Sequence, residues 1–400
     1  MSHSDVVIVG GGIVGLSTAL KLRQRYSDLR VTVIEAESDV GQHQSGHNSG
    51  VLHSGVYYEP GSQKAIYCRT GKEAMEAFCS EHSIPWDKCG KVVVATKEAE
   101  TTRLDKIAER AELNGVQCER INSDQLRELE PAVAGIAALH VPETGIVNYG
   151  TVCRKLAELL RNQGTSIELE FQLSGIQSRT GGLHLQSKSD QQLQCGHLIN
   201  CAGLQSDRVC KMAGVKTEMV VVPFRGEYYE LAPSSETLCR NLIYPVPDPS
   251  FPFLGVHFTR MIDGGVECGP NAVLALARNG YRWRDISLRD LSDTLRFKGF
   301  RKLAAKHWRM GLGEIHRSVS KQAFVTALQK LIPQIRPDDL ILGRAGVRAQ
   351  TVTPDGNLVD DFLFETSERA IHVLNAPSPA ATASFAIADH IVDTFVARAT

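Results

Sequence analysis

The feature that most constrains the fold of this chain is a glycine-rich segment between two apolar runs near the N-terminus. The apolar run at 6–9 is followed at once by Gly10-Gly11-Gly12-Ile13-Val14-Gly15. An amphipathic stretch comes next, and then a second apolar run at 31–34 that ends in Glu35. This order predicts a strand, a glycine turn, a helix and a second parallel strand, which together form a dinucleotide-binding unit of an α/β fold.

Each glycine of this motif has its own predicted role. Gly10 permits the tight turn, Gly12 lets the backbone approach a pyrophosphate, and Gly15 lets the helix pack closely on the sheet. The pyrophosphate would bind amide groups at the helix N-terminus. Glu35 lies twenty residues past Gly15, where a carboxylate accepts hydrogen bonds from ribose hydroxyls.

Composition limits the class of protein. The chain has 400 residues, 42% of them hydrophobic, and a formal net charge of −1. We therefore expect two or three globular domains and no nucleic-acid partner. No apolar stretch reaches the ~18 residues that cross a bilayer, and the first expected strand begins about five residues from the start, which leaves no room for a signal peptide. The ten cysteines form no CxxC pair and no metal-binding cluster, so we expect no metal, reduced thiols and a cytoplasmic location.

The chain is expected to build two domains from alternating pieces. We predict that 1–90, 146–215 and 340–400 form a discontinuous, Rossmann-like dinucleotide-binding domain. We predict that 91–145 and 216–339 form an inserted substrate domain, a mixed β-sheet with helices, because Pro- and Gly-rich turns separate short apolar runs there. Ligand sites favour the interface between such domains.

Three further segments favour FAD over NAD as the dinucleotide. The loop 41–58 is rich in Gly, Ser, Asn and His, which suit close contact with a flat heteroaromatic ligand. A strand ends in small residues at Gly203, and a helix N-terminus within 376–384 would present amides to a flavin carbonyl that gains negative charge. Besides Gly203, the cofactor contacts expected from these segments are Ser45, His47, Asn48, Ser49, Gly50, Pro379, Ala380, Ala381 and Thr382.

Several long and compositionally unusual segments carry a resemblance to a known family. They are GHNSGVLHSGVYYEPGS at 46–62, CGK at 89–91, PFRGEYY at 223–229, IYPVPDPSFPFLGVHFTRMIDG at 243–264, GPNAVLA at 269–275, AGVRAQ at 345–350, DDFLF at 360–364 and NAPSPAAT at 375–382. Over essentially its whole length the chain resembles the FAD-dependent oxidoreductases of the D-amino-acid-oxidase type. Within that superfamily it is similar to the L-2-hydroxyglutarate oxidases, also called dehydrogenases.

The resemblance implies a cofactor, a reaction and partners. It implies FAD, oxidation of L-2-hydroxyglutarate to 2-oxoglutarate, and electron transfer to oxygen or a membrane quinone. It leaves open a covalent link from His47 or His53 to FAD, and peripheral contact with the inner membrane. The alternatives are a related flavoenzyme acting on another 2-hydroxy acid, an amino acid or glycerol-3-phosphate, an NAD-dependent dehydrogenase, and a non-catalytic FAD-binding module.

Oxidation of a 2-hydroxy acid removes the hydroxyl proton and transfers a hydride from C2 to flavin N5, so the site needs a base. Histidine suits this role because its ordinary pKa lies near neutral pH. The two candidates are His257, on an expected strand, and His53, in the loop beside the flavin. On an alternating strand Arg260 points away from the face of His257, so the two need not both reach the substrate.

A dicarboxylate substrate would be held by arginine, whose planar guanidinium binds carboxylates with two hydrogen bonds. Arg225 and Arg348 have small or apolar neighbours, which argue against a solvated position. Arg260 is the third candidate, and Tyr58 is a further pocket residue. The helical region 288–310 is rich in Arg and Lys, so it is the best candidate for membrane contact, although a solvated charged face would have the same composition.

Overall fold

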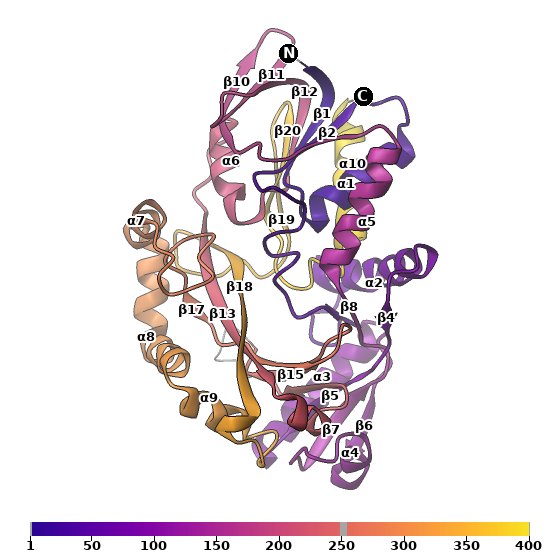
Figure 1. Ribbon diagram of the computed structural model, residues 1–400, viewed down its shortest axis with the longest axis vertical. Helices are drawn as coiled ribbons and strands as arrows, with labels where there is room; N and C mark the ends of the chain where they lie inside the picture. Colours follow the sequence, from indigo (N-terminus) through magenta and orange to yellow (C-terminus); the bar gives the residue numbers. More distant parts are fainter. Residues whose placement is uncertain (1, 249–253, 400) are drawn as a thin grey trace.

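The computed structural model describes residues 2–248 and 254–399, which form two large β-sheets with helices packed around them (Figure 1). The first sheet lies at the top of Figure 1 together with both ends of the chain, and the second sheet lies below it. Part of the 243–264 segment that carries the family resemblance, residues 249–253, lies outside the described residues.

The first sheet has eight strands and a parallel centre. In the order β9, β2, β1, β12 and β20, neighbouring strands run parallel, with β19 antiparallel beyond β20 and the β10–β11 hairpin extending β12. The strands are β1 (Ser2–Val9), β2 (Val31–Ile34), β9 (Ser166–Glu168), β10 (Leu173–Arg179), β11 (Gly182–Ser187), β12 (Gln192–Asn200), β19 (Leu363–Thr366) and β20 (Ala370–Asn375).

The apolar runs of the N-terminal motif are the buried centre of this sheet. Val6, Val7 and Ile8 are completely buried because helices α1, α2, α5 and α10 cover one face of the sheet, and α6 with the β10–β11 hairpin covers the other. A parallel strand that is buried on both faces is continuously apolar, as residues 6–9 of β1 are. The predicted fold class, a discontinuous α/β sheet joined to a second mixed sheet, is confirmed.

Two glycines of the motif are required by close packing. Gly10 has φ +112°, and a Cβ there would lie 2.5 Å from the carbonyl oxygen of Cys201. A Cβ at Gly15 would lie 2.1 Å from the carbonyl oxygen of Gly10, so a side chain would push α1 away from the turn. The turn and packing roles predicted for these two residues agree with this geometry.

The second sheet has nine strands and lies in the order β17, β13, β16, β15, β14, β5, β7 and β6, with β18 pairing along β13. Its pairs are antiparallel except β14 with β5, so it is a mixed sheet. The strands are β5 (Lys91–Ala95), β6 (Glu119–Asn122), β7 (Ala137–Val141), β13 (Val220–Leu231), β14 (Leu242–Pro245), β15 (His257–Arg260), β16 (Val266–Gly269), β17 (Val273–Leu274) and β18 (Leu340–Val352).

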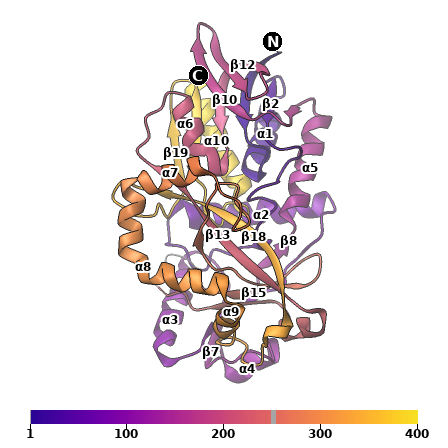
Figure 2. The same ribbon diagram turned by 60° about the vertical axis from the view of Figure 1, so that its left-hand side comes forward.

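A small third sheet joins β3 (Val51–Leu52), β8 (Gly145–Val147) and β4 (Trp86–Asp87). The helices are α1 (Ile13–Arg25), α2 (Gln63–Glu81), α3 (Glu98–Leu113), α4 (Ser123–Leu129), α5 (Tyr149–Asn162), α6 (Ser206–Met212), α7 (Leu288–Arg296), α8 (Lys298–Val319), α9 (Lys321–Leu328) and α10 (Ser384–Ala399). Figure 2 shows α7, α8 and α9 as an arc along the outer side of the second sheet.

The structure corrects the predicted domain boundaries at one place. We assigned 340–352 to the dinucleotide-binding domain, but this segment is β18, which pairs along almost all of β13 in the second sheet. The strand is therefore part of the sheet that we expected to bind substrate. The C-terminal segment joins the first sheet only at β19 and β20. The rest of the two-domain division stays a prediction.

Candidate active site

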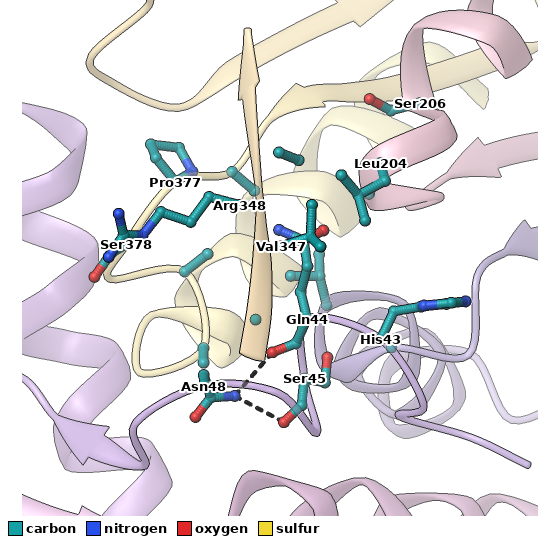
Figure 3. A pocket seen from close by; sticks show the side chains of 18 of the residues that line it. His43, Gln44, Ser45, Asn48, Leu204, Ser206, Val347, Arg348, Pro377 and Ser378 are labelled. Atoms are coloured by element: carbon teal, nitrogen blue, oxygen red, sulfur yellow. Dashed lines mark hydrogen bonds between the residues drawn. The ribbon is translucent and has the colours of Figure 1, made fainter. Parts of the chain in front are cut away.

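A large cavity lies between the two sheets and is lined by residues from both (Figure 3). Its volume is about 1440 Å³, above the range of roughly 300–1,000 Å³ that is usual for a drug-sized ligand. It therefore has room for an extended dinucleotide and a small second molecule. Its lining includes most of the predicted cofactor contacts, namely Gly10, Gly12, Glu35, Ser45, His47, Asn48, Ser49, Gly203, Pro379, Ala380, Ala381 and Thr382.

One end of the cavity is formed by the glycine turn and Glu35. The carboxylate of Glu35 accepts hydrogen bonds from the backbone amides of Gly11, at 2.7 Å, and Glu37, at 3.0 Å. These two bonds fix the carboxylate where the ribose of a bound dinucleotide would lie. Gly12 lines the cavity, and its amide donates to no other residue in the described part of the chain. A polar amide at a helix N-terminus fits an anionic pyrophosphate.

The loop after β2 is fixed by its own polar side chains. Ser45 accepts a hydrogen bond from the amide of Ile13 at 2.9 Å, which joins the loop to the start of α1. Asn48 donates through Nδ2 to the carbonyl oxygens of Gln44 and Ser45, at 2.9 and 2.8 Å (Figure 3). The ring of His47 packs 4.4 Å from the ring of Tyr281, between centroids. These side chains shape the cavity wall, so their contact with a cofactor stays a prediction.

The segment before α10 forms the part of the cavity wall that contacts His53. Ala381 and Thr382 line the cavity, and their backbone amides donate no hydrogen bond within residues 2–248 and 254–399. Such amides fit the predicted role of stabilising negative charge on a flavin. The hydroxyl of Thr382 is buried, where it contacts the hydroxyl of Tyr149 at 2.8 Å and the amide of His53 at 3.2 Å. Thr382 thereby anchors this segment to the loop that carries His53.

Two predicted cofactor residues do not line the cavity. Gly15 is inside α1, and Gly50, with φ +69°, packs so closely on Val147 that a Cβ would lie 2.6 Å from its carbonyl oxygen. Both glycines allow close backbone packing and do not contact the cavity. Cofactor contact by these two residues stays a prediction, because a glycine pattern does not separate packing from ligand contact.

His257 is the candidate base with the clearer geometry. It is 6% exposed, lines the cavity and packs against the ring of Tyr244, with 4.0 Å between centroids. Its Nδ1 lies 2.8 Å from the carbonyl oxygen of Gly255. A carbonyl only accepts, so Nδ1 carries the hydrogen and Nε2 has a free lone pair. Burial, with smaller contributions from Arg348 and Lys91, lowers the pKa of His257 to about 4, so the ring is neutral at pH 7.

His53 lines the same cavity but is tied to the segment before α10. Its Nε2 lies 3.4 Å from the hydroxyl of Ser378, and its backbone amide donates to Thr382. Burial lowers the pKa of His53 to about 3, with smaller contributions from Lys91 and His257. The two histidines thus lie close enough to interact electrostatically, with His53 on the side of the proposed flavin contacts and His257 on the second sheet.

Two of the predicted substrate residues lie at the cavity. Arg348 extends from β18 (Figure 3) and lines the cavity, and its charge acts against the rise in the pKa of Tyr228 that burial causes. Its charge helps to lower the pKa of His257, which places the two side chains within electrostatic range. Tyr58 also lines the cavity, and burial raises its pKa well above the ordinary value.

The other two predicted substrate residues lie elsewhere. Arg225 is completely buried outside the cavity lining, 2.9 Å from the carboxylate of Glu227 and stacked 4.4 Å above the ring of Trp283. Gly226 lines the cavity, so the alternation of β13 turns Arg225 to the opposite face. Arg260 pairs with Asp87 away from the cavity. The structure therefore does not bring Arg225 and Arg260 to the cavity with Arg348 and Tyr58, and a role for them in substrate binding stays a prediction.

The sequence analysis missed aromatic residues that shape the cavity. Tyr228 and Tyr244 both line it, and the sequence analysis assigned neither to the site. Tyr229, its neighbour, packs on Phe324 at the opposite face of the sheet, with 4.8 Å between ring centroids. Side chains alternate between the two faces of β13, which also carries the candidate Arg225. This alternation was the signal that would have placed Tyr228 and Tyr229 on opposite faces of the sheet.

Comparison with known proteins defines the class of this fold and cavity. The family model described as "FAD dependent oxidoreductase" (DAO) matches residues 5–394. The chain therefore belongs to the DAO family of FAD-dependent oxidoreductases. As a member of this family it uses FAD, and the amides and carboxylate at the cavity wall fit that cofactor.

Individual relatives are similar over nearly the full length. The chain is 46% identical to L-2-hydroxyglutarate dehydrogenase of Escherichia coli (97% of this chain, 92% of the relative) and 49% identical to that of Indibacter alkaliphilus (96% of each). It is 42% identical to the mitochondrial L-2-hydroxyglutarate dehydrogenase of Homo sapiens (98% and 88%).

Solved structures share the fold at lower identity. The FAD-bound L-alpha-glycerophosphate oxidase of Mycoplasma pneumoniae has a TM-score of 0.80 at 21% identity (98% and 94% covered). Glycine oxidase of Geobacillus kaustophilus has a TM-score of 0.74 at 19% identity (100% and 96%). Across the described residues, none of the helices has the length and apolar content needed to cross a bilayer.

Proposed function

We propose that this protein catalyses the FAD-dependent oxidation of L-2-hydroxyglutarate to 2-oxoglutarate. The observation that carries the proposal is the 42–49% identity, over nearly the whole chain, to proteins named L-2-hydroxyglutarate dehydrogenase. The cavity supports it, because a neutral histidine and an arginine lie within electrostatic range of each other there. An oxidation of a 2-hydroxy acid needs a base for the hydroxyl proton and a cation for a carboxylate.

In this mechanism His257 takes the proton of the C2 hydroxyl at Nε2, while the carbonyl of Gly255 holds the ring orientation through Nδ1. When bound, FAD supplies the acceptor for the hydride from C2. Arg348 binds a substrate carboxylate. The cations near His257 lower its pKa, and a bound dicarboxylate would offset them, which raises the pKa of His257 and makes it a stronger base.

An anaerobic titration of the purified yellow protein tests the proposed function. We expect L-2-hydroxyglutarate to bleach the flavin absorbance near 450 nm and the D-enantiomer to leave it unchanged. Readmitting air then shows whether oxygen reoxidises the flavin. A protein that neither enantiomer bleaches contradicts the proposal and favours another 2-hydroxy acid, an amino acid or glycerol-3-phosphate, each of which is titrated in the same way.

The resemblance implies two electron acceptors, oxygen and a membrane quinone. A surface on α8 favours the membrane quinone. Trp308, Leu312, Ile315 and Val319 are 56%, 57%, 44% and 70% exposed, and their spacing of three and four residues places them on one side of the helix. The helix α8 also carries six Lys and Arg residues and one Glu. Apolar side chains next to excess positive charge fit the surface of an anionic membrane.

Vesicle sedimentation tests this membrane contact. We expect the holoenzyme to sediment with vesicles that contain phosphatidylglycerol and not with pure phosphatidylcholine, since each basic residue near an anionic surface contributes about 1 kcal/mol. The double change Trp308→Glu and Leu312→Glu should lower the bound fraction about tenfold or more. Leu113→Glu, at a residue that is 73% exposed on another helix, is the matched control. Equal binding of both variants would argue for a solvated face.

A further inference from the structure

The CGK segment at 89–91 carries the family resemblance, yet the mechanism above gives none of its side chains a part in binding the substrate. Lys91 is the first residue of β5 and is 1% exposed. Its ammonium nitrogen lies 4.6 Å from the ring centroid of Tyr57 and 5.1 Å from that of Tyr244. Tyr57 and Tyr244 line the cavity, whereas Lys91 itself is not among its lining residues.

Among the buried lysines that the structure describes, Lys91 differs from the other two in having no carboxylate partner. Lys64 and Lys72 are 9% and 3% exposed, and each has a carboxylate partner, Asp360 at 2.8 Å and Glu76 at 2.7 Å. No ion pair or hydrogen bond joins the Lys91 ammonium to any residue within 2–248 and 254–399. A buried charge without a counter-ion is costly, so a structural role alone does not explain this lysine.

We propose that Lys91 supplies a positive charge behind Tyr57 and Tyr244 that binds the dicarboxylate substrate electrostatically and is protonated when the substrate enters. The inference rests on the proposed function, because it takes the substrate to be a dianion. Lys91 and Arg348 would then provide two cations at the substrate end of the cavity. In a site of low dielectric constant, a charge several ångströms from a carboxylate still contributes strongly to binding.

The surrounding groups make Lys91 the residue that changes charge near neutral pH. Burial lowers the pKa of Lys91 to about 7. Burial also lowers the pKa of His53 to about 3 and of His257 to about 4, and it raises the pKa of Cys68 to about 12. It raises the pKa of Tyr57 well above its ordinary value and that of Tyr244 too. Of these groups, Lys91 alone gains or loses a proton between pH 6 and 9, so dianion binding in that range should take up a proton there.

Calorimetry with glutarate, a dicarboxylate that has no hydroxyl to oxidise, tests the proposal on the holoenzyme. At pH 8, in buffers of different ionisation enthalpy, we expect wild-type protein to take up about one proton per glutarate bound. The Kd should rise about tenfold per pH unit between pH 7 and 9, because protonation of Lys91 becomes harder as pH rises. Lys72→Met, a change at a buried lysine outside the cavity, should behave like wild type.

Two variants distinguish the effect of the charge of Lys91 on glutarate binding from a purely structural effect of the side chain. Lys91→Met should lose the proton uptake and bind glutarate at pH 7 about ten- to a hundredfold more weakly. Lys91→Arg, whose charge does not titrate, should bind glutarate with a Kd that is independent of pH. If Lys91→Met loses FAD, the proposal is tested by two other measurements. These are the number of protons that wild-type protein takes up per glutarate and the pH dependence of the Kd of Lys91→Arg.

Three results overturn the proposal: wild-type protein that does not bind glutarate, glutarate binding without proton uptake, or uptake retained in Lys91→Met. Bleaching by L-2-hydroxyglutarate is measured separately on wild-type protein. A protein that is bleached but shows no Lys91-dependent uptake refutes the role of Lys91 alone. A protein that is not bleached refutes the proposed function itself.

Discussion

Replacing His257 with glutamine is expected to lower kcat by about 10²–10⁴-fold, the usual contribution of a general base, while FAD content stays at the wild-type level. The reason is geometric: Nδ1 donates to the carbonyl of Gly255 at 2.8 Å, which leaves Nε2 as the proton acceptor at the cavity. Glutamine keeps a polar side chain of similar reach but cannot accept and carry the proton. Stopped-flow reduction of the flavin by L-2-hydroxyglutarate measures the effect directly.

The pH dependence and two controls sharpen this test. Burial lowers the pKa of His257 to about 4. Protonation of this ring should therefore slow flavin reduction only in acidic solution, and the rate near pH 7 should not depend on the titration of His257. His140→Gln changes a half-buried histidine of the same sheet that does not line the cavity, and it should retain wild-type rates. His53→Gln is the competing assignment. A His257→Gln enzyme within a few-fold of the wild-type rate would transfer the base role to His53.

Replacing Arg348 with methionine is expected to raise the KM for L-2-hydroxyglutarate by about ten- to a hundredfold, since a hydrogen bond to a charged group contributes about 1.5–3 kcal/mol. Arg348 lines the cavity on β18 and lies within electrostatic range of His257. Loss of the guanidinium should therefore weaken binding of a dicarboxylate more than binding of a monocarboxylate. Steady-state kinetics with L-2-hydroxyglutarate and L-2-hydroxybutyrate provide the comparison.

Arg260→Met is the matched control for Arg348. Arg260 was predicted from the sequence to bind substrate but pairs with Asp87 outside the cavity, so its loss should leave both KM values near those of wild type. An equal rise of KM for the two substrates in Arg348→Met would remove Arg348 from carboxylate selection. A large effect of Arg260→Met would contradict the placement of the cavity.

Most of the cofactor wall could be predicted from the sequence because its signals are local. Gly10 has φ +112°, a backbone conformation that favours glycine. That requirement leaves a recognisable pattern in the sequence, a glycine at a fixed spacing from an apolar strand. Gly15 and Gly50, which the structure places outside the cavity lining, show the limit of this signal. Close packing between backbones and close approach of a ligand both require glycine, so the pattern does not distinguish them.

The substrate wall could be predicted only in part. Arg225 and Arg348 have similar sequence surroundings, yet the first lies on the outer face of its strand and the second at the cavity. A shift of one residue in strand register exchanges the two faces, and the register of β13 is set by pairing with β18, more than a hundred residues away. That distant pairing also placed 340–352 in the second sheet, against our prediction.

By itself, the sequence determined the dinucleotide-binding unit from β1 to Glu35, the composition of the flavin-side loop and the family. Contiguous residues form these features, and local backbone geometry and strand periodicity govern them. Only the tertiary structure decided which arginine reaches the cavity and which tyrosines line it. It also showed that Lys91 lies behind two aromatic rings without a carboxylate partner. Those facts depend on contacts between strands from distant parts of the chain, and no local pattern specifies them.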